Sequence, residues 1–389
     1  MKYWRGYLVA AILAAVAYAL KSFASTYNVL LDMVYPYLTR IVQTVLAQWS
    51  GGVSFCLWQL LAMAGAVLLV VTVVLMIVFR WNPIQWFGWV TAAVSLGFLV
   101  HTCIWGLNYY AGPLADDVRL ETTEYTLTEL AEATRYYRDR ANELCSLVDR
   151  NPDGSVDFGT FEDLAAQAGD GFRNLTYEQN FAVFAGSTLP VKKLGWSDYY
   201  SSVGICGITV ALTGEAAVNP EIPAVSLPFT MCHEMCHRMS IAVERDANFG
   251  AFLSCISNAD LNYRYSGYYM AFRYCYIALS QYDSAEASKI MMEAREPLKA
   301  DFASYDAFFQ KNRNEKATEL SDKANDTYLK TSGDTKGVAS YGDVCDLLVN
   351  WRLQMLARDH ADEQDEEKFN PLDKNQVDLT GIVNADKGN

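Results

Sequence analysis

The hydrophobic positions are unevenly distributed along the chain. Three long apolar stretches lie near the N-terminus, at about 6–22, 53–79 and 86–107. A transmembrane helix needs about 20 consecutive, predominantly apolar residues, so we predict that the second and third stretches span a membrane. The first stretch is shorter and is flanked by basic residues. We expect it to be an uncleaved anchor helix, with a cleaved signal peptide as the alternative.

Polar positions are frequent elsewhere, and their spacing is mostly helical. Residues 27–48 have the pattern of an amphipathic helix that lies along a membrane surface. Further on, Thr126-Leu127-Thr128-Glu129 resembles a capping box, and apolar residues follow it at helical spacing. Residues 204–212 alternate in the manner of a strand.

Together these elements predict a membrane-anchored, mainly α-helical protein. Residues 1–107 would form a membrane region with three N-terminal transmembrane helices. Residues 108–360 would form a mostly helical domain with a small β-sheet. Residues 361–389 are polar and acidic, and because such a segment has little apolar surface to bury, we predict a disordered tail.

Charge is divided in the same way as hydrophobicity. Residues 1–106 contain five basic residues and one acidic residue, whereas residues 107–389 contain 26 and 44. An apolar, basic head joined to an acidic body is typical of a domain anchored to a lipid bilayer. The acidic body also argues against nucleic acid as a partner, because phosphates repel it.

The basic residues around the apolar stretches predict the orientation in the membrane. Lys2, Arg5 and Arg80 favour the cytoplasmic side, against Lys21 and Arg40 on the other side. With an odd number of spans, the C-terminal domain is then expected to be extracytoplasmic.

One short motif carries most of the candidate chemistry. His233 and His237 are four residues apart, and Glu234 directly follows the first. On a helix both imidazoles project from one face, one turn apart, and can reach one tetrahedral zinc ion. Glu234 points away from that face, where a carboxylate can take a proton from metal-bound water. The motif therefore predicts a Zn²⁺ site with Glu234 as general base.

Glu244 is the preferred third ligand. On one unbroken helix it would lie about 16 Å along the axis from His233, which is too far for a shared ion. We therefore expect a sharp turn within 238–243 and a second helix from Glu244 to about Cys255. Asn248 follows on the same face and could accept the outer N–H of a ligating histidine. Alternative third ligands are Asp246, Asp260 and Glu215.

The cysteines give little support for a thiolate site or a disulfide framework. The chain has nine cysteines, of which seven follow the apolar stretches, and an odd number cannot pair completely. Cys232 and Cys236 flank the histidines. On a helix Cys232 points about 100° away from His233, so we expect both cysteines to be buried small hydrophobic residues.

The motif and its surroundings resemble a known family. The shared segments are Leu227-Pro228-Phe229-Thr230 through His233-Glu234-Met235-Cys236-His237 to Glu244, with Trp105-Gly106-Leu107-Asn108-Tyr109, Thr213-Gly214-Glu215-Ala216 and Tyr265-Ser266-Gly267-Tyr268. In this order they resemble the family called domain of unknown function 3810. The resemblance implies a multi-pass protein of the bacterial cell membrane with a zincin-like HExxH metallopeptidase domain. The family tends to place glycine in the turn where this chain has Ser240.

The expected function is hydrolysis of amide bonds in a peptide or protein substrate, in the manner of a gluzincin. Tyr265 and Tyr268 are the predicted donors to the tetrahedral oxyanion, and the strand edge at 207–212 is predicted to bind the substrate backbone. Two alternatives stay open. One is an intramembrane protease, and the other is a non-catalytic, membrane-tethered protein whose metal ion only joins helices. The oligomeric state is also open.

Overall fold

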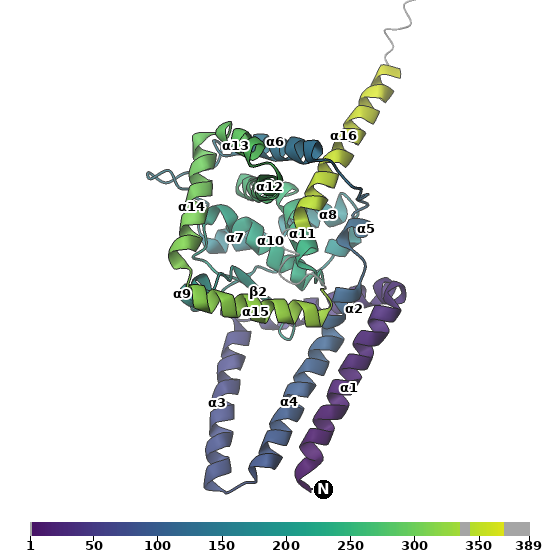
Figure 1. The fold of residues 1–389 in the computed structure, drawn as a ribbon, viewed down its shortest axis with the longest axis vertical. Helices are drawn as coiled ribbons and strands as arrows, with labels where there is room; N and C mark the ends of the chain where they lie inside the picture. Colours follow the sequence, from purple (N-terminus) through teal and green to yellow (C-terminus); the bar gives the residue numbers. More distant parts are fainter. Residues whose placement is uncertain (1, 335–342, 369–389) are drawn as a thin grey trace, which may run out of the picture.

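Three long helices form one end of the molecule in a computed structural model that describes residues 2–334 and 343–368 (Figure 1). They are α1 (Arg5–Thr26), α3 (Leu57–Val78) and α4 (Pro83–Ile104), each long and apolar enough to cross a membrane. The three predicted stretches are thus helical, with ends shifted by a few residues. α4 ends at Ile104 because Trp105 leaves helical geometry and starts a short 3₁₀ helix, η2 (Gly106–Tyr110).

The three helices do not pack equally. α1 and α4 lie along each other, and a Cβ at Gly6 would overlap the backbone of Gly88, so their close contact needs glycine there. α3 stands apart from this pair in Figure 1, and Gln59 is its one buried residue.

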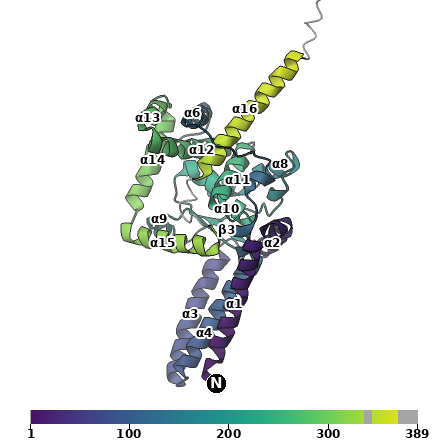
Figure 2. The ribbon, with the colours of Figure 1, turned by 45° about the vertical axis from the view of Figure 1, so that its right-hand side comes forward.

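A fourth helix, α2 (Asn28–Ser50), lies between the three long helices and the rest of the molecule (Figures 1 and 2). It confirms the helix expected at 27–48 and continues through Pro36 without a break. One face of α2 is buried and polar, and includes Thr39, Arg40 and Gln43. Its other side exposes apolar side chains, among them Met33.

The remaining described residues form a mostly helical body, and the described chain as a whole is 72% helical. The body helices are α5 (Leu114–Asp117), α6 (Leu127–Leu144), α7 (Phe161–Gln167), α8 (Asp170–Tyr177), α9 (Ser197–Ser202), α10 (Leu227–Arg238), α11 (Glu244–Ile256), α12 (Leu261–Tyr282), α13 (Ser284–Met292), α14 (Glu296–Asn312), α15 (Glu315–Ser332) and α16 (Val344–Lys368). Short 3₁₀ helices are η1 (Lys2–Trp4), η3 (Ala182–Phe184) and η4 (Ala224–Ser226).

The small sheet has three strands in the order β1-β3-β2. β1 (Lys192–Lys193) is parallel to β3 (Glu215–Val218), and β2 (Gly207–Val210) is antiparallel to it. The prediction of a mainly helical chain with a small sheet is therefore confirmed, and β2 is an outer strand.

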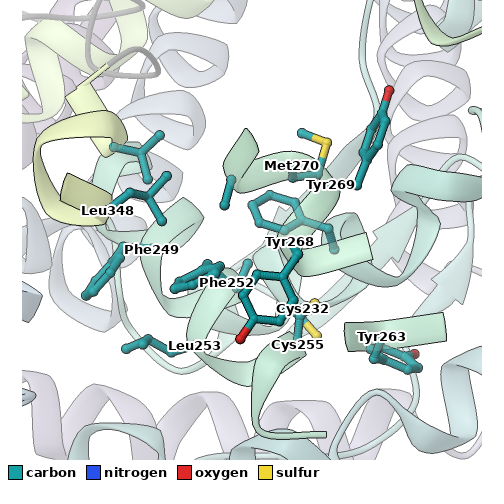
Figure 3. Packing of buried hydrophobic residues seen from close by; sticks show 14 of the residues in the cluster. Cys232, Phe249, Phe252, Leu253, Cys255, Tyr263, Tyr268, Tyr269, Met270 and Leu348 are labelled. Atoms are coloured by element: carbon teal, nitrogen blue, oxygen red, sulfur yellow. The ribbon is translucent and has the colours of Figure 1, made fainter. Parts of the chain in front are cut away.

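The core of the body is built on α10, α11 and α12, with α6 packed against α12. Figure 3 shows their apolar side chains packed together, with Cys232 and Cys255 beside each other and Phe252 next to Tyr268. The predicted capping box at the start of α6 is present, since Thr126 and Glu129 each accept the other's backbone N–H. The helix packing that surrounds α10 fixes the orientation of the motif helix.

The predicted start of the tail at residue 361 differs from the structure. α16 continues to Lys368, so the first residues assigned to a tail are helical. Ala, Glu, Gln and Lys are frequent there, and their high helix propensity offsets the lack of an apolar stripe. The rest of that tail, from 369, lies outside the described residues.

Glu215 joins the sheet to the beginning of α3. Its carboxylate accepts the backbone N–H groups of Leu57 and Trp58 at 2.7 and 2.8 Å, and pairs with Lys192 at 2.6 Å. The Glu215 side chain is fully buried. This explains its place in the family-like segment Thr213-Gly214-Glu215-Ala216.

Replacing Glu215 by alanine is expected to lower the free energy of unfolding by about 3–5 kcal/mol, because Lys192 and two amides lose their buried partner. Thermal unfolding of the detergent-solubilised chain measures the loss. Glu296→Ala, which removes an exposed partner of Lys299, is the control and should change stability by less than about 0.5 kcal/mol. Equal effects of the two substitutions would contradict the role of Glu215.

Candidate metal centre

The predicted helical hairpin is present. α10 ends at Arg238 and α11 begins at Glu244, so the chain reverses within 239–243. Ser240 has φ of 71°, in the left-handed region that the family's glycine would favour. Its hydroxyl accepts a hydrogen bond from Thr39 of α2 at 3.0 Å. A residue with a Cβ is strained in this region, and here the strained residue also makes a specific contact with α2.

The hairpin brings three donor atoms together. The Nε2 atoms of His233 and His237 are 3.1 Å apart. Glu244 Oε2 lies 3.2 Å from the first and 3.4 Å from the second. Among the described His, Cys, Asp and Glu residues, His233, His237 and Glu244 are the three whose ligand atoms lie close enough together to bind one metal ion.

The spacing of these atoms fits zinc. Donors placed about 2.0–2.1 Å from one zinc ion in a tetrahedron are about 3.3–3.4 Å apart, close to the three observed separations. In addition, Glu244 Oε2 is buried and has no hydrogen-bond partner within the described part of the chain. Its nearest polar neighbours are the two imidazole nitrogens. A buried carboxylate oxygen without a hydrogen bond is costly, and a shared cation would satisfy it together with both imidazoles.

The charges of the three ligands are strongly coupled. Burial alone would lower the pKa of His237, but the Glu244 carboxylate, together with Glu234 and the Ile241 carbonyl, outweighs burial and raises it to about 9. For Glu244, burial acts to raise the pKa, and the two imidazoles reverse this effect and lower it below its ordinary value. The site thus favours positive charge beside Glu244, from a proton or from a metal ion.

His237 is oriented by the backbone. Its Nδ1 lies 2.8 Å from the carbonyl oxygen of Ile241 in the hairpin turn. This contact leaves Nε2 facing the other two donors.

The predicted role of Asn248 as the acceptor for a ligating histidine is wrong for His237. Asn248 does lie on the expected face of α11 and lines the cavity described below, but its side-chain oxygen accepts from the hydroxyl of Tyr274 at 3.3 Å. Ile241, in the turn, is closer to His237 in sequence than Asn248 is. Its carbonyl oxygen accepts the imidazole N–H in place of Asn248. His233 Nδ1 has no partner among the described residues.

Glu234 is held beside the ligands by β2. Its Oε2 accepts the hydroxyl of Thr209 at 2.7 Å. A Cβ at Gly207 would overlap the carboxylate, so only glycine leaves room for Glu234 in this position. Glu234 is buried, and burial raises its pKa.

The three ligands and Glu234 face a cavity of about 1210 Å³. One wall is β2 with its preceding loop, another is formed by Trp105 and by Tyr109 of η2, and a third is one face of α15. Arg273 and Tyr274 of α12 also line the cavity. The predicted substrate-binding edge, 207–212, thus borders the cavity through its first residues, although the strand ends at Val210.

Tyr265 and Tyr268 are not at this cavity, and their predicted catalytic role is wrong. The Tyr265 hydroxyl donates to the buried carboxylate of Asp301. Tyr268 packs against Phe252 in the apolar core, and Figure 3 shows it there close to Cys232. Both residues project from the sides of α12 that face the core, whereas Tyr274, two turns further along, reaches the cavity.

The alternative third ligands lie elsewhere. Glu215 pairs with Lys192, and Asp260 caps α12 by accepting the N–H of Asn262 at 2.7 Å. Asp246 accepts the N–H of Leu114 at 3.1 Å. Cys232 and Cys236 are fully buried in apolar surroundings, as predicted.

Several contributors were not identified from the sequence. Thr209 and Gly207 position Glu234, but they lie on a short strand whose alternation of apolar and polar residues is weak. Tyr274 lies in a helix with many aromatic residues, and the sequence does not distinguish it from the others. Trp105 could have been identified from the sequence, because it is the first residue of the segment Trp105-Gly106-Leu107-Asn108-Tyr109, which resembles the family. Its indole N–H donates to the carbonyl oxygen of His237 at 3.1 Å.

A family profile described as "Protein of unknown function (DUF3810)" matches residues 32–349, which include all three ligands. The chain belongs to this family. Comparisons with curated proteins and with solved structures gave no match. Membership confirms the resemblance seen in the sequence.

Purified full-length chain is expected to retain about one zinc ion, because three donors converge on one point. Glu244→Gln should reduce the zinc content well below one per chain, since an amide is a poorer ligand than a carboxylate. Elemental analysis after dialysis measures the content. Glu234→Gln is the matched control and should keep its zinc. If Glu244→Gln keeps the wild-type zinc content, Glu244 is not a ligand and the ion is bound elsewhere.

Ser240→Gly and Ser240→Ala both remove the contact with Thr39, but only alanine keeps a Cβ in the left-handed region. We expect the glycine variant to be more stable than the alanine variant by about 1 kcal/mol. Unfolding of both variants in the same detergent measures this difference. If the two are equally stable, the serine is not strained at this turn.

Proposed function

We propose that this family member is a membrane-anchored, zinc-dependent metallopeptidase that hydrolyses amide bonds in peptides or proteins. The observation that carries the proposal is the convergence of His233, His237 and Glu244 within 4.8 Å in an open cavity, with Glu234 beside them. A three-ligand site that faces a cavity is the arrangement of catalytic zinc, whereas structural zinc sites are closed by four protein ligands.

The two histidines and Glu244 would hold the ion, with one imidazole oriented by the Ile241 carbonyl. When bound, zinc supplies Lewis acidity that polarises the scissile carbonyl and lowers the pKa of water. Glu234 then acts as general base, accepts the proton of the attacking water and delivers it to the leaving amine. Thr209 keeps the Glu234 carboxylate in position during both transfers.

The outer strand β2 offers a place for the substrate backbone. β2 pairs with β3 on one side only, and Gly207, Ile208 and Thr209 line the cavity. An extended peptide can add to such an edge through main-chain hydrogen bonds. Glu234 is bonded to Thr209 of the same strand, so the general base would lie beside the bound backbone.

Tyr274 is the cavity residue that suits stabilisation of the developing oxyanion. It lines the cavity, and its hydroxyl donates to Asn248 Oδ1 at 3.3 Å. This hydrogen bond would be exchanged for one to the substrate oxygen. A neutral phenol donor costs little reorganisation when charge develops on the substrate oxygen. We assign to Tyr274 the role that Tyr265 and Tyr268 were expected to have.

The domain that carries the site would be zincin-like and extracytoplasmic, in the bacterial cell membrane. The positive residues near the three apolar helices favour this orientation. The intramembrane alternative has less support, because the helices apolar enough to cross a membrane among the described residues are α1, α3 and α4, and the metal helix α10 belongs to the body.

The second candidate function is a closed, structural metal site in a non-catalytic tethered protein. It would need a fourth protein ligand. The group of candidate ligands in the described residues has three members, which favours catalysis.

Glu234→Gln should keep zinc and fold but lower the rate of peptide hydrolysis by about 10²–10⁴-fold, because the general base is lost. The measurement is digestion of a broad peptide library by the purified zinc-loaded chain, with new termini identified by mass spectrometry. Asp260→Asn, far from the cavity, is the control and should keep the wild-type rate. If Glu234→Gln hydrolyses the peptides at the wild-type rate, Glu234 is not the general base.

A further inference from the structure

The metal centre is attached directly to the end of α4. Trp105 is the first residue after this helix, and its indole donates to the carbonyl oxygen of the ligand His237 at 3.1 Å. Trp105 and Tyr109 also line the cavity. If α4 crosses the membrane, the floor of the cavity is therefore made by the residues that leave the bilayer, where tryptophan and tyrosine are enriched.

A second, independent attachment runs through α2. Arg40 donates to the carbonyl oxygen of Met239 at 3.2 Å, and Thr39 to Ser240 at 3.0 Å, so α2 contacts the turn of the metal hairpin. The opposite side of α2 exposes apolar residues, as expected of a helix lying on a bilayer. One helix diameter, about 10–12 Å, then separates the hairpin turn from the lipid.

A third attachment lies across the cavity, at α3. Gln59, near the start of α3, exchanges hydrogen bonds with Gly195 at 3.1 and 3.2 Å, directly before α9. Tyr199 of α9 lines the cavity and is 61% exposed. The cavity therefore has one wall above α3 and another above α4.

α15 connects these two walls. Near its start, Thr318 donates to the carbonyl oxygen of Ser202 in α9 at 3.2 Å. Near its end, Tyr328 packs on Tyr109, with 6.4 Å between ring centroids. Figures 1 and 2 both show α15 at the base of the body, level with the upper ends of the long helices. α15 thus forms one side of the cavity at the height of these ends.

Below the body, α3 is not packed along α4, so apolar side chains on both helices are exposed. α3 stands apart from α4 in Figure 1, and its most apolar window has no buried residue. A Cβ at Gly65 of α3 or at Gly97 of α4 would meet no atom within 4 Å. A further apolar helix could lie there and lead its chain upward into the cavity.

We propose that the site acts on the membrane-proximal segment of another membrane-spanning polypeptide, and cleaves it close to the bilayer surface. This inference rests on the proposed function and names its substrate class. An extended chain advances about 3.3 Å per residue, so a site about 10–30 Å above the lipid is reached within about ten residues of a span. Anchoring both partners in one membrane also raises their effective concentration.

The test uses the full chain, loaded with zinc and reconstituted in phospholipid vesicles, with three probes. Each probe carries the same randomised 12-residue segment. In the first it directly follows a model transmembrane helix. In the second, a rigid helical spacer of about 30 residues holds it about 45 Å further out. The third is the free segment. New termini are identified and their rates of appearance compared, with Glu234→Gln as the inactive control in every arm.

The inference predicts that the membrane-proximal probe is cleaved at least about tenfold faster than the spaced probe and the free segment, with cuts within about ten residues of the helix. Equal rates for the proximal and spaced probes would overturn it while leaving the peptidase proposal intact. If the wild-type chain cleaves none of the probes and no library peptide, the proposed function fails and this inference falls with it.

Discussion

The structure of the site depends on one constraint, the reversal of the chain at 239–243. Without it, Glu244 would lie far along a continued helix from His233 and could not share an ion with it. With it, three donor atoms meet within 3.4 Å of one another. The turn is fixed by the left-handed Ser240, by the Ile241 carbonyl that receives His237, and by contacts from α2. Each of these orients a ligand or the backbone next to one.

The same turn is where the membrane-like helices meet the body. Trp105, after the end of α4, donates to the carbonyl oxygen of His237 just before the turn, and Arg40 of α2 donates to that of Met239 within it. A rigid link of this kind fixes the height of the ligands above the helices. The segment Trp105-Gly106-Leu107-Asn108-Tyr109 is therefore distant from the metal motif in the sequence but in direct contact with it in the structure. This explains why a segment that resembles the family occurs at the end of α4.

The sequence predicted best those features for which helix geometry allows few arrangements. The spacing of His233 and His237, together with the length limit on a shared ion, was sufficient to predict the hairpin and Glu244. The long apolar stretches were equally clear. Prediction failed for Tyr265, Tyr268 and Asn248, because the direction of a side chain on a buried helix depends on tertiary packing that one sequence does not encode locally. Gly207 and Thr209 lie far from the motif in sequence, and nothing in a short strand indicated their contact with Glu234.

The central claim is that His233, His237 and Glu244 bind one metal ion and leave a position open toward the cavity. X-ray absorption spectroscopy of the zinc-loaded full chain tests it most directly. The account predicts a four-coordinate ion with nitrogen and oxygen neighbours only, at about 2.0–2.1 Å, of which one is exchangeable with an added small anion. A sulfur neighbour at about 2.3 Å, or four ligands that resist exchange, would contradict it, because the ion would then be held by cysteine or closed by the protein.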